Sequence, residues 1–236
     1  MIPRSQRSRS NDQSTKGSVM AETISLLNPD FDSATSISRA VDALRDGTLI
    51  IAPLEHGYVF LADAFNHGAV QTIHRLRYDA RGVATQVIVG DISAARGITR
   101  EFGPKISALC EKFWPGMLTV NIAPALGLVW DLGDARTLEQ VSIRVPAASF
   151  VREIAAAAGP LAVAAAAHAG QKPKRDTALF PARDSDYAFL FDGGELLEGP
   201  NSTVISVKDD GVFLVRQGAI SLGELRAITP NIGIPA

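Results

Sequence analysis

Arginines near the expected ends of helices and strands are the residues of this sequence best suited to chemistry. Arg144 follows the alternating strand pattern of "VSIRVP", and Arg216 ends the strand pattern before "QGAI". Arg75 and Arg77 end a helical pattern. Guanidinium groups bind phosphates and carboxylates through paired hydrogen bonds, so these arginines predict an anion site. A helix-dipole role for Arg75 and Arg77, and an edge-strand salt bridge for Arg144, are the alternatives.

Two hydroxyl residues add to this candidate site. Ser202 and Thr203 open the strand pattern of "STVISV", directly after a Gly-Pro-Asn turn. Hydroxyls and backbone N–H groups in such a position can hold an anion, although they can equally cap an ordinary turn. No residue is assigned a certain catalytic role. The predicted substrate-binding or nucleotide-binding set is Arg75, Arg77, Arg144, Ser202, Thr203 and Arg216.

Several other kinds of chemistry lack their sequence signals. The chain has no Walker-type glycine loop, no GxGxxG or GxSxG motif and no cluster of metal ligands, so no metal site is predicted. The histidines are scattered, and Cys110 is the only cysteine, which favours a reducing cytoplasm. A net charge of −2 gives no general attraction to nucleic acid or acidic lipid. No apolar run reaches the roughly 18 to 20 residues of a membrane span.

The elements that must position these residues follow from hydrophobic periodicity. Helical spacing predicts helices over residues 33–47, 68–77, 103–113, 148–158 and 221–228. Apolar runs and alternation predict two strands within 48–64 and further strands over 85–90, 117–125, 141–147, 160–165, 187–194, 202–207 and 211–218. The charged stretch over 171–187 predicts a mobile loop. Because helices and strands interleave irregularly, we expect one α/β domain with a mixed, twisted sheet.

The N-terminal residues differ in composition from the rest of the chain. Residues 1–22 are polar and rich in Arg and Ser, which predicts a disordered tail. A basic arm that contacts RNA is the alternative, and Met20 offers a second candidate start. Residues 23–236 are predicted to form a single domain, with its core at about 33–222.

The order of several motifs resembles the YrdC-like family, the threonylcarbamoyl-AMP synthases. These motifs span about residues 33–222 and are "APLEHGYVFLAD", "IHRLR", "FWPGMLTV", "SIRVPA", "PLAVAAAAHAG", "DGG", "NSTVISV" and "LVRQGAI". The resemblance implies an open, twisted mixed α/β sheet flanked by helices, with a cationic concave cleft. It also implies a nucleotidyltransferase-type reaction. In that reaction L-threonine, bicarbonate and ATP give threonylcarbamoyl-AMP and pyrophosphate for tRNA modification.

The resemblance also sets the expected ligands. ATP is the expected substrate, Mg²⁺ is compatible with it, and no tightly bound cofactor is expected. The expected partner is a nucleotide or phosphate-bearing small molecule, with tRNA or double-stranded RNA as an alternative and no membrane. The oligomeric state is left open. Ser202 matches the family's serine at the strand entry, and the arginines would neutralise phosphates.

The sequence departs from the family pattern at several positions, three of which are degenerate site positions. Leu54 stands where the family usually has threonine, and Ala165 and Ala167 stand where it has serine and asparagine. A lost ligand hydrogen bond typically costs about 0.5–1.5 kcal/mol, and about 1.4 kcal/mol corresponds to a tenfold change in rate. These losses predict weak or absent synthase activity. His168 is the residue best placed in the sequence to replace a missing group.

Three interpretations follow from these observations. The first is a family protein that keeps an anion-binding cleft but has altered substrate chemistry. The second is an active synthase with a rebuilt site. The third is an RNA-binding module that uses the cleft and the basic stretch "QKPKR" at residues 171–175, whose binding should weaken steeply with salt. The sequence alone leaves open whether the chain is an enzyme.

Overall fold

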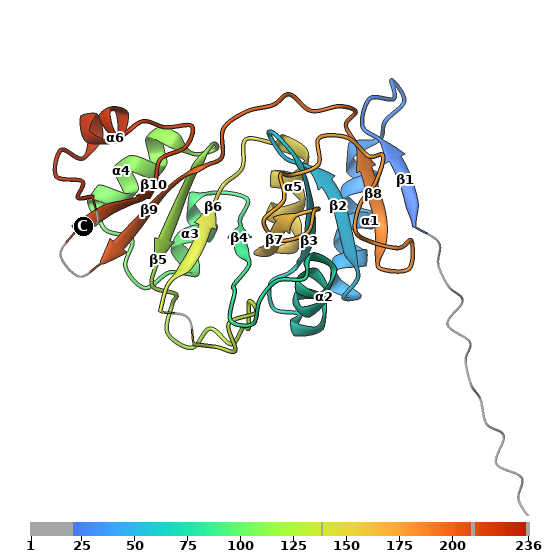
Figure 1. The fold of residues 1–236 in the computed structure, drawn as a ribbon, viewed down its shortest axis with the longest axis horizontal. Coiled ribbons are helices and arrows are strands. Elements are labelled where there is room, and N and C mark those ends of the chain that lie inside the picture. Colours follow the sequence, from blue (N-terminus) through green and yellow to red (C-terminus); the bar gives the residue numbers. More distant parts are fainter. Residues whose placement is uncertain (1–20, 138, 209–210, 235–236) are drawn as a thin grey trace, which may run out of the picture.

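The structure is a computed structural model that describes residues 21–137, 139–208 and 211–234. The described strands form one ten-stranded mixed sheet in the order β1-β8-β2-β3-β7-β4-β6-β5-β9-β10. The sheet runs from β1 and β8 on one side of the view to β9 and β10 on the other, with helices packed against it (Figure 1). Residues 1–20 of the predicted disordered tail lie outside the described residues. Glu22, which the sequence composition places in that tail, is the first residue of β1.

The elements alternate along the chain in a way that the sequence periodicity largely anticipates. The strands are β1 (Glu22–Ser25), β2 (Leu49–Pro53), β3 (Tyr58–Asp63), β4 (Gln86–Ile88), β5 (Leu118–Ile122), β6 (Val141–Arg144), β7 (Leu161–Ala165), β8 (Tyr187–Asp192), β9 (Thr203–Lys208) and β10 (Gly211–Arg216). The helices are α1 (Ser33–Arg45), α2 (His67–Arg77), α3 (Ile92–Gly97), α4 (Pro104–Phe113), α5 (Ser149–Ala158) and α6 (Leu222–Ile228).

One half of the sheet, made of β8, β2, β3 and β7, carries apolar side chains on both faces. Ile50 of β2 packs in a cluster with Ile154 of α5 and with side chains of α1. Its neighbour Ile51 belongs to the cluster on the other face, which includes Ile73 of α2. Because both faces are covered, these strands appear in the sequence as nearly continuous apolar runs.

The other half, made of β4, β6, β5, β9 and β10, is apolar on one face and carries a mixture of polar and apolar side chains on the other. Leu118 and Val120 of β5 pack in the cluster that contains Leu109 of α4 and Leu225 of α6. The intervening Thr119 points to the opposite face, because successive side chains of a strand alternate. That opposite face supplies the floor of the candidate site.

The predicted fold class, an α/β domain with an open mixed sheet, is confirmed. Two elements were not predicted. The strand β1 is mostly exposed and pairs in parallel with β8, so it has no apolar alternation in the sequence. The helix α3 is capped by Asp91 and has six residues, and a helix of this length is too short to show a helical period in the sequence. Among the described residues, no helix is long and apolar enough to cross a membrane.

Candidate functional site

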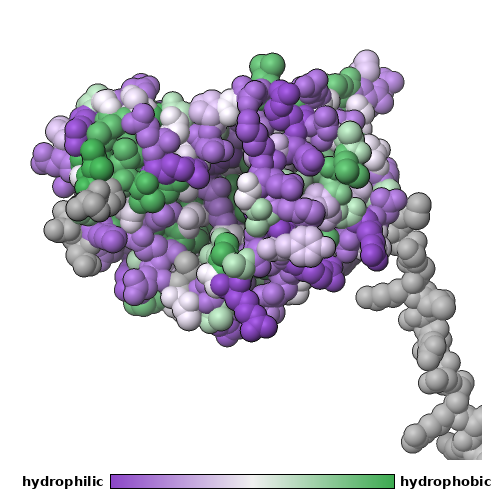
Figure 2. Space-filling model, in the orientation of Figure 1, coloured by the Kyte–Doolittle hydropathy of each residue, from purple (hydrophilic) through white to green (hydrophobic). Residues whose placement is uncertain are grey.

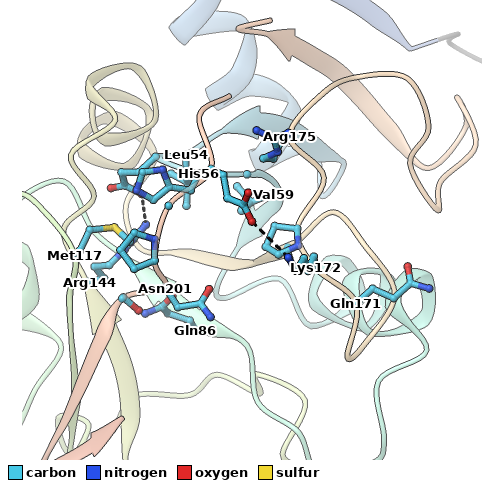
Figure 3. Close-up of a pocket in the computed structure, with 18 of the residues that line it drawn as sticks. Leu54, His56, Val59, Gln86, Met117, Arg144, Gln171, Lys172, Arg175 and Asn201 are labelled. Carbon is cyan, nitrogen blue, oxygen red and sulfur yellow. Dashed lines mark hydrogen bonds and ion pairs between the residues drawn. The ribbon is translucent and has the colours of Figure 1, made fainter. Parts of the chain in front are cut away.

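A cleft of about 710 Å³ opens on the mixed face of the sheet, where the ends of β2, β6 and β7 meet the segment before β9. A space-filling view shows a hollow near the middle of the molecule with hydrophilic residues around it (Figure 2). In the close-up, Met117, Arg144 and Asn201 lie on one side of the cleft and Lys172 and Arg175 on the other (Figure 3). The polar lining consists of Glu55, His56, Gln86, Arg144, Gln171, Lys172, Arg175, Glu198, Asn201, Ser202 and Arg216.

Arg144, the last residue of β6, is paired with an internal carboxylate. Its Nη2 donates to Glu55 Oε2 at 2.8 Å, and only 6% of the arginine side chain is exposed. The second oxygen, Glu55 Oε1, accepts a hydrogen bond from the backbone N–H of Ala147 at 2.8 Å. The Arg144 Nε is buried and has no hydrogen-bond partner among the described residues. The cleft wall thus contains a buried guanidinium with one unsatisfied N–H.

Arg216, the last residue of β10, differs because it approaches a hydroxyl instead of an acid. Its Nη2 donates to the backbone oxygen of Ser202 at 2.9 Å and to Ser202 Oγ at 3.2 Å. Ser202 Oγ also accepts from Thr119 Oγ1 at 2.9 Å, and Thr119 Oγ1 accepts from Gln86 Nε2 at 2.8 Å. The hydrogen bonds that Arg216 makes with the described residues all go to Ser202, so no carboxylate neutralises its charge there.

Thr203 lies beside Ser202 but points into the protein. It is fully buried, and its Oγ1 donates to the Ile220 carbonyl at 2.7 Å while accepting from the N–H groups of Gly218 and Ile220 at 2.9 Å. A Cβ at Gly218 would come within 2.1 Å of the Asn201 carbonyl oxygen, so a glycine is needed for this close approach. Thr203 therefore fixes the segment after β10 against the entry of β9.

Arg77 lies behind the cleft wall. Its Nη1 donates to the carbonyl oxygens of Ala165 at 2.5 Å and Ala167 at 2.9 Å. Its Nε donates to Asp79 Oδ2 at 3.1 Å, and the arginine side chain is 16% exposed. The guanidinium therefore ties the end of α2 to the segment after β7, and Arg77 does not line the cleft.

Arg75 lies at the surface, outside the cleft lining. Its Nη2 is 3.2 Å from Asp186 Oδ1, and 66% of the arginine side chain is exposed. The helix periodicity that brings Arg75 and Arg77 close in sequence therefore separates them in space, since residues two apart on a helix point in different directions.

The rim opposite Arg144 carries two of the three cations of the "QKPKR" stretch, Lys172 and Arg175. Lys172 Nζ is 3.4 Å from Glu198 Oε1, and Arg175 Nη2 is 3.1 Å from Glu195 Oε1. The side chains of Lys172, Glu198 and Glu195 are largely exposed, whereas that of Arg175 is 41% exposed. The cleft lining as a whole has four cationic side chains, Arg144, Lys172, Arg175 and Arg216, against two carboxylates, Glu55 and Glu198, which leaves an excess of positive charge.

The wall at the end of β7 presents apolar groups. Leu54 and Ala165 line the cleft, whereas Ala167 is fully buried. His168 does not line the cleft, and its ring packs against Tyr78 with 5.0 Å between the ring centroids. The sequence interpretation in which His168 replaces a missing polar group therefore receives no support from its position.

Tyr58, the first residue of β3, anchors two loops near the cleft. Its hydroxyl donates to the Gly194 carbonyl at 2.8 Å and accepts from the Gly193 N–H at 2.9 Å, while its own backbone N–H donates to the Lys174 carbonyl. Burial of the side chain raises the pKa of Tyr58 to about 12. The neutral hydroxyl is thus retained far into the alkaline range.

Sequence reasoning did not single out Glu55, His56 or Gln86 as site residues, although all three line the cleft. Glu55 and His56 follow directly on the Pro53 break, where a turn at the end of two buried strands is a useful signal for a site. Gln86 is harder to find, because it is one polar residue in a three-residue buried strand.

Comparisons with known proteins find relatives over most of the chain. The Sua5/YciO/YrdC family model, described as "Telomere recombination", matches residues 42–218. A protein of Mycobacterium tuberculosis, provisionally named a threonylcarbamoyl-AMP synthase, is 29% identical over 203 residues, which cover 86% of this chain and 92% of the relative. The threonylcarbamoyl-AMP synthase of Bacillus subtilis is 31% identical over 204 residues, and the alignment covers 84% of this chain and 58% of that protein.

The fold has a counterpart among solved structures. Sua5 of Pyrococcus abyssi, in complex with L-threonine, superposes with a TM-score of 0.79 at 23% identity. The match covers 91% of this chain and 63% of the Sua5 chain, so this chain spans less than two thirds of that protein's length. At this identity the superposition establishes the fold of the chain and leaves its ligand to be argued from the site.

Proposed function

Because the chain belongs to the Sua5/YciO/YrdC family, we propose that its cleft binds a nucleotide but supports threonylcarbamoyl-AMP synthesis weakly or not at all. The observation that carries the proposal is the contrast inside the cleft. Arg144 and Arg216 line it, and so do the apolar side chains of Leu54 and Ala165. The groups suited to phosphate are retained, and those suited to the polar substrate are replaced by apolar side chains.

Phosphate binding follows from the charge and geometry of the lining. Arg144, Lys172 and Arg175 are each paired with a glutamate, whereas Arg216 has a guanidinium that the described residues do not neutralise. Charge-assisted hydrogen bonds from guanidinium groups to phosphate are short and roughly twice as strong as neutral ones. Arg144 and Arg216 would hold phosphate oxygens, and the Ser202 hydroxyl lies between Arg216 and Thr119 of the sheet.

The weakness of catalysis follows from the apolar wall. The family reaction joins L-threonine, bicarbonate and ATP, and its rate depends on holding three reactants in line. Ala165 offers no side-chain hydrogen bond, and its carbonyl oxygen is already engaged by Arg77. Lost contacts of about 0.5–1.5 kcal/mol each would lower the rate by roughly tenfold per 1.4 kcal/mol.

Magnesium is part of the proposal only as a companion of the phosphates. Within residues 21–137, 139–208 and 211–234, no group of three His, Cys, Asp or Glu side chains is arranged to hold a metal ion. Mg²⁺ commonly binds through substrate phosphates and waters with few protein ligands. Mg²⁺ would therefore enter with ATP, and its effect is expected on ATP affinity and not on the unliganded protein.

Isothermal titration calorimetry with ATP, AMP and L-threonine, each added alone, tests the binding. ATP is expected to bind, and Arg216→Ala should weaken it about 10- to 100-fold, as expected for losing one charged hydrogen-bond partner. Arg45→Ala is the matched control, because Arg45 ends α1, is exposed and lies outside the cleft lining. Equal effects of the two substitutions, or no ATP binding at all, would refute the nucleotide site.

A pyrophosphate-release assay tests the second half of the proposal. With ATP, bicarbonate and L-threonine together, release should remain close to the level without threonine. Robust release that depends on both threonine and bicarbonate would establish the active synthase with a rebuilt site and overturn the loss of activity.

RNA binding is the weaker candidate, because two of the three cations of the basic loop are already paired. Lys172 and Arg175 each lie beside a glutamate, which reduces the local positive potential available to a phosphate backbone. The same calorimetry with tRNA decides the matter: binding whose affinity falls steeply with salt would favour the RNA-binding module.

A further inference from the structure

A chain of three side chains connects the floor of the sheet to the cleft. Gln86 on β4 donates from Nε2 to Thr119 Oγ1 at 2.8 Å, and Thr119 on β5 donates onward to Ser202 Oγ at 2.9 Å. Arg216 Nη2 reaches the same Ser202 Oγ from the other side at 3.2 Å. Gln86, Ser202 and Arg216 line the cleft, while Thr119 is 3% exposed beneath them.

The hydrogen bonds among these side chains run in one direction, from Gln86 through Thr119 to Ser202. The Gln86 amide nitrogen and the Arg216 guanidinium can only donate. Thr119 accepts from Gln86 and gives its own single hydrogen to Ser202. The Ser202 oxygen then accepts from both Thr119 and Arg216, which fills its two lone pairs. The only capacity left on Ser202 is its own O–H as a donor.

We propose that Gln86 and Thr119 are positioning residues that make the Ser202 hydroxyl a dedicated hydrogen-bond donor to an anionic oxygen in the cleft. This inference rests on the proposed nucleotide site. The oxygen belongs to a phosphate or pyrophosphate group, since the adjacent Arg216 supplies the positive charge. Because both lone pairs of the Ser202 oxygen already accept hydrogen bonds, the orientation of its O–H is fixed before the anion binds. Binding therefore costs little conformational entropy at this hydroxyl.

The hydrogen-bond relay Gln86–Thr119–Ser202 predicts a specific pattern of affinities for ATP and for inorganic pyrophosphate. These affinities are measured by calorimetry at fixed pH and salt. Thr119→Val keeps the shape but removes the hydroxyl, and it should weaken binding about 2- to 10-fold. Thr119→Ser keeps the hydroxyl and should restore most of the affinity. Gln86→Leu should resemble Thr119→Val, because Thr119 is then free to turn its hydrogen away from Ser202.

The decisive arm is a double-mutant cycle with Ser202→Ala. If Thr119 acts through Ser202, then Thr119→Val should change the affinity less than 2-fold in the Ser202→Ala background. Asn121→Ala is the matched control: Asn121 lies two residues along β5, accepts from Ser142 Oγ at 2.6 Å and is outside the cleft lining. Thermal unfolding of each variant establishes that it folds.

Two outcomes overturn the inference in distinguishable ways. Full additivity of Thr119→Val and Ser202→Ala, or a Thr119→Ser variant as weak as Thr119→Val, would leave the nucleotide site intact and refute the relay. A wild-type protein that binds neither ATP nor pyrophosphate would refute both the relay and the proposed function.

Discussion

The two walls of the cleft use their arginines in opposite ways. On the wall formed by the ends of β6 and β10, Arg144 and Arg216 line the cleft. On the wall after β7, the guanidinium of Arg77 lies behind the surface and binds the carbonyls of Ala165 and Ala167. One wall presents charge to a ligand, and the other uses charge to hold an apolar surface in place.

This difference shows that the identity of a residue is a weaker guide to function than the partners its polar atoms already have. Arg77 has its N–H groups bound to two carbonyls and a carboxylate. Arg216 binds only Ser202 among the described residues. Substitutions of arginines on the two walls should therefore separate into those that affect ligand affinity and those that affect folding stability.

The largest effect is expected at Arg144, which belongs to both categories. Arg144→Met keeps much of the side-chain volume but leaves the Glu55 carboxylate, 12% exposed, without its counter-ion. Removing one partner of a buried ion pair typically destabilises a protein by about 3–5 kcal/mol. Urea unfolding of the ligand-free protein should show this loss.

The pair itself can be tested with a double variant. Arg144→Met combined with Glu55→Gln should recover a large part of the lost stability, because no uncompensated charge remains. A loss below about 1 kcal/mol for Arg144→Met would mean that water solvates Glu55, and that the cationic wall is more open than its burial indicates.

A smaller effect is expected at Arg77, where a substitution should lower the free energy of unfolding more than it changes ligand affinity. Arg77→Met removes hydrogen bonds to two backbone carbonyls, each worth about 1.5–3 kcal/mol when the donor is charged. Since Asp79 keeps His74 as a partner at 3.0 Å, the net loss should lie at the lower end of the summed range, about 3 kcal/mol in urea unfolding. ATP affinity should fall less than in Arg216→Ala, and a larger fall would place Arg77 functionally on the cationic wall.

How far the sequence predicts these walls depends on what each wall is made of. The strands and most helices follow from periodicity, and the strand ends Arg144 and Arg216 follow from counting along those strands. The partners of Arg77 do not follow, because Ala165 and Ala167 lie 88 and 90 residues away in the chain and are joined to it only when β3 and β7 pair. The Glu55–Arg144 pair spans 89 residues and is equally hidden.

Restoring polar groups to the apolar wall should give unequal results at its two alanines. Ala165 faces the cleft, so Ala165→Ser should change stability by no more than about 0.5 kcal/mol. Ala167 is fully buried, so Ala167→Asn must displace its neighbours and should cost about 1–3 kcal/mol. Unfolding in urea measures both, with L-threonine titration as the functional readout. An Ala167→Asn variant that is as stable as the parent and binds threonine would show that this wall can open into a substrate pocket.

The smallest effect is expected at Arg75, which lies on neither wall. Its ion pair with Asp186 joins a side chain that is 66% exposed, and exposed pairs contribute about 0–1 kcal/mol that salt screens further. Arg75→Ala should therefore leave ATP affinity unchanged and lower stability by less than about 1 kcal/mol, with the difference shrinking between low and high salt. A loss of ATP affinity comparable to that of Arg216→Ala would instead mean that the end of α2 moves toward the ligand on binding, and the distinction between the two walls would hold only for the unliganded protein.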